Sequence, residues 1–172
     1  MAGIVKGPAV AVCGPSAPRD ADLVAARKVG GLLAERGATL ICGGLGGAMA
    51  AAAAGARERG GVVVGILPGS DPAEAGPDVE VAIATGLGEM RNCLIARSAE
   101  AMIAIGGGAG TLSEIAFALV LGKPVVGIDT WQLQPPGGAL PSRGIHAAHS
   151  AQEAVDWALG QVPRVAASKA GG

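Results

Sequence analysis

The chain has 172 residues, of which 50% are apolar and 16% are charged, a composition typical of a folded globular protein and not of a disordered one. Its formal net charge is −1 and its lysines and arginines do not cluster, which argues against the basic face that nucleic-acid binding needs. No apolar run approaches the roughly 20 residues of a membrane span, and residues 1–8 do not resemble a signal peptide. We therefore expect neither a nucleic-acid partner nor a membrane partner.

The length favours a single domain over residues 1–163, followed by a flexible tail at residues 164–172. With one phenylalanine, two tryptophans and no tyrosine, the core has to consist of Ala, Val, Leu and Ile, and 30 glycines permit close packing. The three cysteines, Cys13, Cys42 and Cys93, lie far apart and lack metal-ligand spacing. We therefore expect reduced, largely buried thiols in a cytoplasmic protein.

Short apolar runs alternate with helical patterns along most of the chain. In chain order, the patterns predict a strand at 9–13, a helix at 20–36, a strand at 39–42, a helix at 48–59, strands at 62–67 and 79–84, a helix at 87–99, a strand at 101–105, a helix at 114–121, a last strand at 124–128 and a closing helix at 151–159. The Pro/Gly-rich stretch 134–144 is expected to be a surface loop. Because several strands are continuous apolar runs with short connections to helices, we predict an α/β fold: a doubly wound, Rossmann-like, mainly parallel sheet with helices on both faces.

In a doubly wound sheet, ligands bind beyond the carboxyl ends of the strands, near the point where the strand order reverses. This rule gathers the segments 14–18, 43–47, 68–71 and 106–111 at one edge of the sheet. In the first of these segments, Ser16 is placed to reach a phosphate or a base, although an ordinary turn serine fits the position equally well.

Two of these segments are glycine-rich turns between a strand and a helix. The first contains Gly43, Gly44, Gly46 and Gly47, and the second runs Gly106, Gly107, Gly108, Ala109, Gly110, Thr111. Glycines let backbone amides approach a ligand closely, and the N-terminus of the following helix carries a partial positive charge, a combination that binds phosphate. Glycines also serve tight turns and close packing, but their number in two such turns favours a phosphorylated small-molecule ligand.

Other nucleotide and metal sites fit the sequence poorly. Neither turn has the Gly-x-Gly-x-x-Gly spacing of a dinucleotide site, and Gly122-Lys123 is followed by Pro124 and not by the Ser or Thr of a phosphate-binding P-loop. The only histidines, His146 and His149, are expected on a surface loop, so no metal site is predicted.

Three motifs in order resemble one family. Gly106–Glu114 resembles the Pro-Gly-Gly-x-Gly-Thr-x-x-Glu signature of the Lonely Guy family, the cytokinin-activating phosphoribohydrolases often mislabelled as lysine decarboxylases. Residues 43–49 (GGLGGAM) are similar to that family's Gly-Gly-x-x-Gly-x-Met segment, and residues 88–92 (GEMRN) fall where the family has an Arg-Lys pair. Gly106 and Asn92 replace the family's proline and lysine, and this makes the chain more similar to the sister branch that includes the molybdenum cofactor carrier protein.

The resemblance implies that Arg91 and Glu114 are catalytic residues in a site that cleaves a base–ribose bond without a metal or organic cofactor. A carboxylate can stabilise the cation-like sugar and orient the attacking water, and an arginine can hold the 5′-phosphate or the departing base. It also implies a homodimer or homotetramer. The residues expected to contact substrate or phosphate are Ser16, Gly43, Gly44, Gly46, Gly47, Met90, Asn92, Gly107, Gly108, Ala109, Gly110 and Thr111.

Alternatives stay open at this point. Thr111 and Glu114 also have the spacing of a helix capping box, and Arg91 also fits a surface ion pair with Glu89 or Glu100. Lys123 lies at the edge of the sheet opposite the site, which argues against a Schiff-base lysine and a decarboxylase. The sequence therefore leaves two functions: a phosphoribohydrolase acting on nucleoside 5′-monophosphates such as N6-substituted AMP, and a non-catalytic carrier or sensor of a phosphorylated ligand such as a pterin cofactor.

Overall fold

The computed structural model describes residues 7–134, 136–138 and 144–163. Within them the chain forms, in order, β1 (Ala9–Cys13), α1 (Asp20–Glu35), β2 (Thr39–Cys42), α2 (Ala48–Glu58), β3 (Val63–Leu67), the short 3-10 helix η1 (Pro72–Glu74), β4 (Val81–Ala84), the 3-10 helix η2 (Gly88–Arg91), α3 (Asn92–Ser98), β5 (Ala101–Ile105), α4 (Ala109–Val120), β6 (Val125–Ile128), β7 (Ile145–Ala147) and α5 (Ala151–Gln161). Among these helices none is long and apolar enough to cross a membrane.

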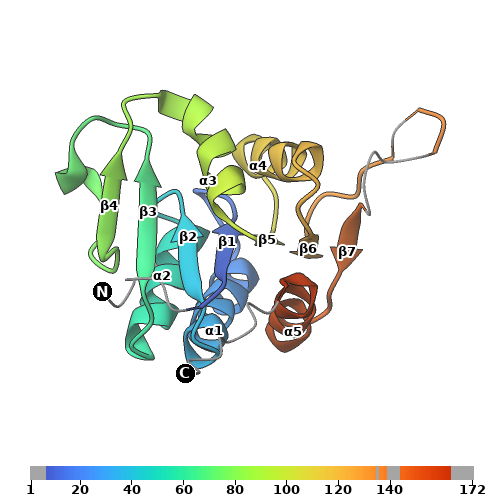
Figure 1. Cartoon of the computed structure of the whole chain (residues 1–172), viewed down its shortest axis with the longest axis horizontal. Helices are drawn as coiled ribbons and strands as arrows, with labels where there is room; N and C mark the ends of the chain where they lie inside the picture. The colour runs from blue at the N-terminus through green and yellow to red at the C-terminus, as the bar shows by residue number, and fades with distance from the viewer. Residues whose placement is uncertain (1–6, 135, 139–143, 164–172) are drawn as a thin grey trace, which may run out of the picture.

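The strands form one parallel sheet in the order β4-β3-β2-β1-β5-β6-β7 (Figure 1). The chain builds outward from β1 to β4, returns to place β5 on the other side of β1, and then builds outward to β7. The strand order therefore reverses between β1 and β5, which is where a doubly wound sheet opens a crevice. The predicted Rossmann-like α/β fold is confirmed.

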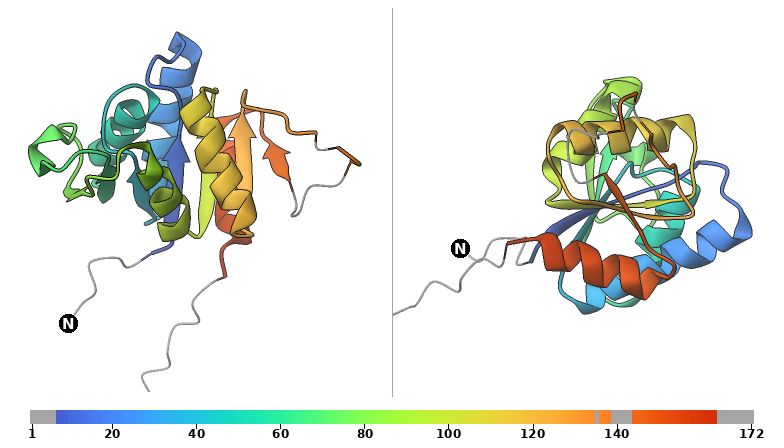
Figure 2. Two further views of the ribbon diagram at one scale, coloured as in Figure 1. Left: turned by 90° about the horizontal axis from the view of Figure 1, so that it is seen from above. Right: turned by 90° about the vertical axis from the view of Figure 1, so that its right-hand side faces the viewer.

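Helices cover both faces of the sheet (Figure 2): α1, α2 and α5 lie on one face, and α3 and α4 lie on the other. Each central strand packs against both layers. In β1, Val10 and Val12 belong to the core under α1, α2 and α5, whereas Ala11 and Cys13 belong to the core under α3 and α4. This double burial explains why the central strands are continuous apolar runs.

Small residues allow the nearly aromatic-free core to pack closely. Where α1 crosses α2, a Cβ added to Gly30 would lie 1.9 Å from the carbonyl oxygen of Ala52. A Cβ on Gly55 would lie equally close, at 1.9 Å, to the carbonyl oxygen of Arg27. The two helices therefore approach to backbone contact at these glycines, where any side chain would force them apart.

Three details of the predicted elements are wrong. The last strand is β7 and not 124–128, because the three residues Ile145-His146-Ala147 are too few to give a strand pattern. His146, expected in a surface loop, lies in this strand and stacks on Trp157 of α5 with ring centroids 4.6 Å apart. Helix α4 begins at Ala109, five residues earlier than predicted, because the glycines of its first turn resemble a loop. The predicted helix 87–99 is divided into η2 and α3.

Two further predictions concern loops. Residues 134, 136–138 and 144 lie outside helices and strands, as expected for the surface loop 134–144, whereas residues 135 and 139–143 fall outside the described residues. The tail predicted at 164–172 also falls outside them.

Candidate functional site

The loops after β1, β2 and β5 enclose a pocket of about 420 Å³ at the carboxyl edge of the sheet. We call it the glycine-turn pocket. It lies at the point where the strand order reverses, and its walls include the first turn of α4. Its lining residues are Gly14, Pro15, Ser16, Ala17, Leu45, Gly46, Met49, Glu89, Arg91, Asn92, Gly107, Gly108, Ala109, Gly110, Thr111 and Glu114.

The N-terminus of α4 forms one wall of this pocket. Gly108 is the N-cap, Ala109 is the first helical residue, and the N–H groups of the first turn have no partners within the helix. Gly107, Ala109 and Gly110 are exposed, so the backbone here is accessible. An accessible helix N-terminus with small side chains has the geometry of an anion-binding site.

The backbone at Gly106, where the family signature has proline, has a conformation that proline cannot adopt. Its φ is +61°, which proline cannot adopt because its ring fixes φ near about −65°. A Cβ at position 106 would also lie 2.9 Å from Oδ2 of Asp22, whose carboxylate lies directly behind the turn. This departure from the family pattern is therefore coupled to the packing of Asp22, on the first turn of α1.

Arg91 is buried, with 5% of its surface exposed, and so is the neighbouring Asn92, with 2% exposed. Arg91 Nη1 donates a hydrogen bond to Asn92 Oδ1, and Asn92 Nδ2 donates to Ser113 Oγ over 2.8 Å. Ser113 Oγ donates in turn to the carbonyl oxygen of Gly110 over 2.7 Å. A chain of hydrogen bonds thus links Arg91 to the first turn of α4.

This burial excludes the surface ion pair that the sequence allowed for Arg91. Within the described part of the chain, Arg91 has no carboxylate partner at ion-pair distance, and Glu100 instead accepts a hydrogen bond from the amide of Ala9. Gly43 makes room for the guanidinium, because a Cβ there would lie 2.8 Å from Arg91 Nη2.

Glu114 is buried too, with 4% of its surface exposed. Burial raises the pKa of its carboxyl group to about 8; nearby Arg91 opposes this rise and Glu89 adds to it. Glu114 is therefore mostly protonated at neutral pH, unlike the carboxylate that the resemblance implies. The capping-box interpretation does not hold, because α4 begins before Thr111 and no side chain caps it.

Three buried polar atoms of the pocket wall have no hydrogen-bond partner among the residues that the structure describes: Arg91 Nε, Thr111 Oγ1 and Glu114 Oε1. Leaving such groups unpaired typically costs about 1–3 kcal/mol each. All three residues line the same pocket, so these buried atoms lie in the layer of side chains that forms its wall.

The remaining predicted site residues lie around the pocket in different ways. Ser16, Gly46 and Asn92 line it, whereas Met90 is 73% exposed on η2 and is not part of the lining. Gly43, Gly44 and Gly47 are not part of it either. A Cβ on Gly44 would lie 2.6 Å from Leu67 Cδ2, and one on Gly47 would lie 2.5 Å from the carbonyl oxygen of Pro15, so these glycines allow loops to pack closely.

The helix α2 N-terminus is occupied by the protein itself. The amide of Ala48 donates to the carbonyl oxygen of Pro15 over 3.1 Å, so the first glycine-rich turn supports the loop after β1. Both helices expected at this edge contribute to the pocket lining: α2 through Met49, and α4 through Ala109, Gly110 and Thr111 of its first turn.

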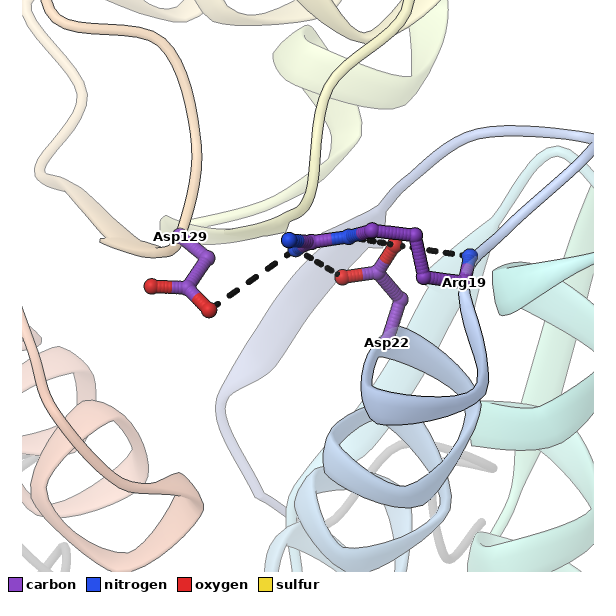
Figure 3. Close-up of polar contacts among 3 residues, drawn as sticks. All are labelled: Arg19, Asp22 and Asp129. Carbon is purple, nitrogen blue, oxygen red and sulfur yellow. Dashed lines mark hydrogen bonds and ion pairs between the residues drawn. The ribbon is translucent and has the colours of Figure 1, made fainter.

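A second pocket of about 450 Å³ adjoins the first, and Pro15, Ala17 and Gly107 line both. We call it the tryptophan pocket, and its other lining residues are Arg19, Asp22, Asp129, Thr130, Trp131 and Gln132. Arg19 reaches between the two aspartates (Figure 3): its Nη2 lies 2.6 Å from Asp22 Oδ1 and 3.7 Å from Asp129 Oδ2. The motifs gave no signal for this pocket, because its residues come from the start of α1 and the segment after β6.

The cysteines and the side chains that could bind a metal were also located. Cys13, Cys42 and Cys93 are free; the first two are buried and Cys93 is half-buried. Burial raises the pKa of Cys13 well above its usual range and that of Cys42 to about 11, so both are poor nucleophiles. Over the described ranges, three or more His, Cys, Asp or Glu side chains do not come together as a metal site.

The fold and the position of these pockets define a Rossmann-like α/β protein with a crevice at the switch point of its sheet. Residues 7–161 match the model of the SLOG cluster4 family, and the chain belongs to this Lonely Guy-like family, as the motifs predicted.

Two proteins of similar sequence and one solved structure support this assignment. An uncharacterized protein of Archaeoglobus fulgidus is 42% identical over 134 residues, covering 78% of this chain and 83% of that protein. A cytokinin riboside 5′-monophosphate phosphoribohydrolase of Mycobacterium tuberculosis is 36% identical over 132 residues, or 71% of each chain. The molybdenum cofactor binding protein of Rippkaea orientalis superposes with a TM-score of 0.81 at 35% identity, covering 88% of this chain and 95% of that one.

Proposed function

We propose that this protein binds a phosphorylated small molecule in the glycine-turn pocket, with the phosphate at the N-terminus of α4. One observation carries the proposal: the pocket that the α4 N-terminus lines is also lined by buried Arg91, Thr111 and Glu114, each of which has a buried polar atom without a partner among the described residues. Exposed backbone at Gly107 and Gly110 supplies amides for the phosphate, and Arg91 supplies a positive charge.

In the enzymatic version, the ligand is a nucleoside 5′-monophosphate and the protein hydrolyses its base–ribose bond. A water oxygen bonds to C1′, the C1′–N bond breaks with its electron pair leaving on the base, and one proton moves from the water side to the base. Glu114, protonated in the free pocket, donates to the departing base nitrogen and regains a proton from the water. The similarity to the Mycobacterium tuberculosis phosphoribohydrolase supports this version.

Incubation with AMP and N6-substituted AMP, followed by chromatography for free base and ribose 5-phosphate, tests the enzymatic version. We expect product from the unaltered protein, loss of product in Glu114→Ala, and no change in Glu58→Ala, because the exposed carboxylate of Glu58 pairs with Arg27 and does not line the pocket. Equal product from the unaltered protein and Glu114→Ala contradicts the assignment of Glu114.

In the second version, the protein holds a phosphorylated ligand, such as a pterin cofactor, without cleaving it. Two observations favour this: Asn92 stands where the family has a lysine and engages Arg91, and the Rippkaea orientalis neighbour is a molybdenum cofactor binding protein. Thermal stabilisation by phosphorylated ligands without turnover would support it.

We further propose a cytoplasmic homodimer or homotetramer built from one domain over residues 1–163. The free cysteines fit a reducing compartment. Exposed apolar side chains at Met90 on η2 and at Phe117 and Val120 on α4 offer a surface for a second copy. Light scattering coupled to size-exclusion chromatography tests the assembly, and a monomer at micromolar concentration would contradict it.

A further inference from the structure

The tryptophan pocket is a second compartment of the same cleft. Gly107, at the centre of the glycine-rich turn, lines both pockets, so a ligand phosphate at the start of α4 has a direct path into the second one. At about 450 Å³, this compartment is large enough for a planar ring system.

Trp131 supplies a fixed aromatic surface beside Gly107. Its indole Nε1 donates to the carbonyl oxygen of Gly108 over 3.2 Å, and a Cβ on Gly107 would lie 2.9 Å from the same nitrogen. The indole is thus held against the glycine-rich turn while 40% of its surface stays exposed. A held, partly exposed indole is a stacking surface for a heterocycle.

The charges of this compartment disfavour a second phosphate. Asp22 and Asp129 outnumber Arg19, and the carboxylate of Asp22 is already occupied by hydrogen bonds from the backbone and side chain of Arg19. These hydrogen bonds between Arg19 and Asp22 lie at the N-terminus of α1, and Asp129 does not take part in them. Asp129 is 73% exposed at its side chain, and its only ion pair within residues 7–134, 136–138 and 144–163 is the 3.7 Å contact with Arg19, so it keeps acceptor capacity. Thr130 adds a buried Oγ1 without a partner in the described part of the chain.

We propose that the tryptophan pocket binds the heterocycle of the phosphorylated ligand, and that this heterocycle has a 2-amino-4-oxo edge of the guanine kind. The ring stacks on Trp131, and its adjacent ring N–H and amino group donate to the two oxygens of Asp129. This inference rests on the phosphate site of the proposed function. Because Glu114 lines only the first pocket, a ligand seated this way is held and not cleaved, which joins the inference to the carrier version.

Trp131 also provides the readout. The other tryptophan, Trp157 of α5, stacks on His146 of β7. In a Trp157→Phe background, Trp131 is therefore the sole source of indole fluorescence in the chain. We would titrate this protein with ribose 5-phosphate, AMP, IMP and GMP. IMP lacks the 2-amino group of GMP, and AMP lacks the whole donor pair. We expect GMP to quench Trp131 and to bind about tenfold more tightly than IMP, with AMP weaker still.

Asp129→Asn tests the partner of the donor edge. Asparagine tolerates the positive φ of 48° at this position, so the variant should fold. We expect it to bind GMP no better than IMP while binding ribose 5-phosphate as before. Asp156→Asn, which removes an exposed ion-paired aspartate on α5, serves as the matched control and should retain the GMP preference.

The outcomes separate this inference from the proposed function. If ribose 5-phosphate binds but GMP and IMP bind equally, or Asp129→Asn keeps the preference for GMP, the inference fails and the phosphate site stands. If neither ribose 5-phosphate nor GMP binds, both fail.

Discussion

Arg91 and Asn92 are neighbours in the chain, and the guanidinium of Arg91 donates to the side-chain oxygen of Asn92 inside the wall of the glycine-turn pocket. Through Asn92 and Ser113 this contact reaches the backbone of Gly110, in the first turn of α4. The two features expected to hold an anion, the arginine and the helix N-terminus, are therefore joined by one hydrogen-bonded chain.

Replacing Asn92 should loosen this chain. Asn92→Ala removes the acceptor of Arg91 and the donor to Ser113 in a buried setting, so we expect a loss of about 1–3 kcal/mol in the free energy of unfolding. Ribose 5-phosphate should also bind several-fold more weakly, because Arg91 is no longer held. Urea denaturation and calorimetric titration measure the two effects, and unchanged affinity would show that Asn92 does not position Arg91.

Restoring the family's proline at position 106 should destabilise the protein. Gly106→Pro and Gly106→Ala both force a side chain into a φ of +61° and toward the carboxylate of Asp22. Gly60→Ala is a matched control, because Gly60 has a φ of +69° but open space around its Cβ position. We expect the free energy of unfolding, measured by urea denaturation, to fall by about 1–2 kcal/mol in the control, by more in Gly106→Ala and by most in Gly106→Pro. Equal losses for both alanine variants would contradict the role of Asp22.

These two residues show what the sequence could and could not predict. Apolar runs and glycine-rich turns identify the parallel sheet and the α4 turn, because buried strands and strand–helix turns have local patterns. The departures at Gly106 and Asn92 are visible as substitutions, but their contacts with Asp22 and Ser113 depend on segments distant in the chain. The tryptophan pocket had no local signal, since α1 and the segment after β6 meet only in the fold.

The titration of Glu114 should make stability depend on pH. Its pKa is about 8 in the folded protein against an ordinary value of 4.5, so between these values the unfolded chain releases a proton that the folded chain keeps. The free energy of unfolding therefore falls as pH rises through this window, by on the order of a few kcal/mol. The side chain of Glu114→Gln stays neutral at every pH. The free energy of unfolding of this variant, relative to that of the unaltered protein, should therefore rise from pH 5 to pH 8.

Urea denaturation of both proteins at pH 5 and pH 8 measures this effect. The stability difference between the two proteins at pH 5 is compared with that at pH 8, so the contributions of the other titrating groups cancel. Glu58→Gln, at an exposed ion pair, should show little change. A stability difference between Glu114→Gln and the unaltered protein that is the same at both pH values would show that Glu114 is not held protonated.

The contact between α1 and α2 should not tolerate an added methyl group. Gly30→Ala places a Cβ 1.9 Å from the carbonyl oxygen of Ala52, and relieving this clash by moving the helices should cost about 1–3 kcal/mol or more. Gly160→Ala, in α5 with open space around its Cβ position, should instead raise stability by about 0.5–1 kcal/mol through helix propensity. Thermal unfolding of both variants tests the pair, and a stabilised Gly30→Ala would contradict this packing.

The central claim, a phosphate site at the N-terminus of α4, is tested most directly by calorimetric titration of ribose 5-phosphate into three proteins. Gly110 has open space around its Cβ position, so Gly110→Ala and Gly110→Asp should both fold. The unaltered protein and Gly110→Ala should bind, and Gly110→Asp should bind at least about tenfold more weakly, because its carboxylate repels the phosphate at the helix N-terminus. Equal binding by Gly110→Asp, or no binding by the unaltered protein, would contradict the site.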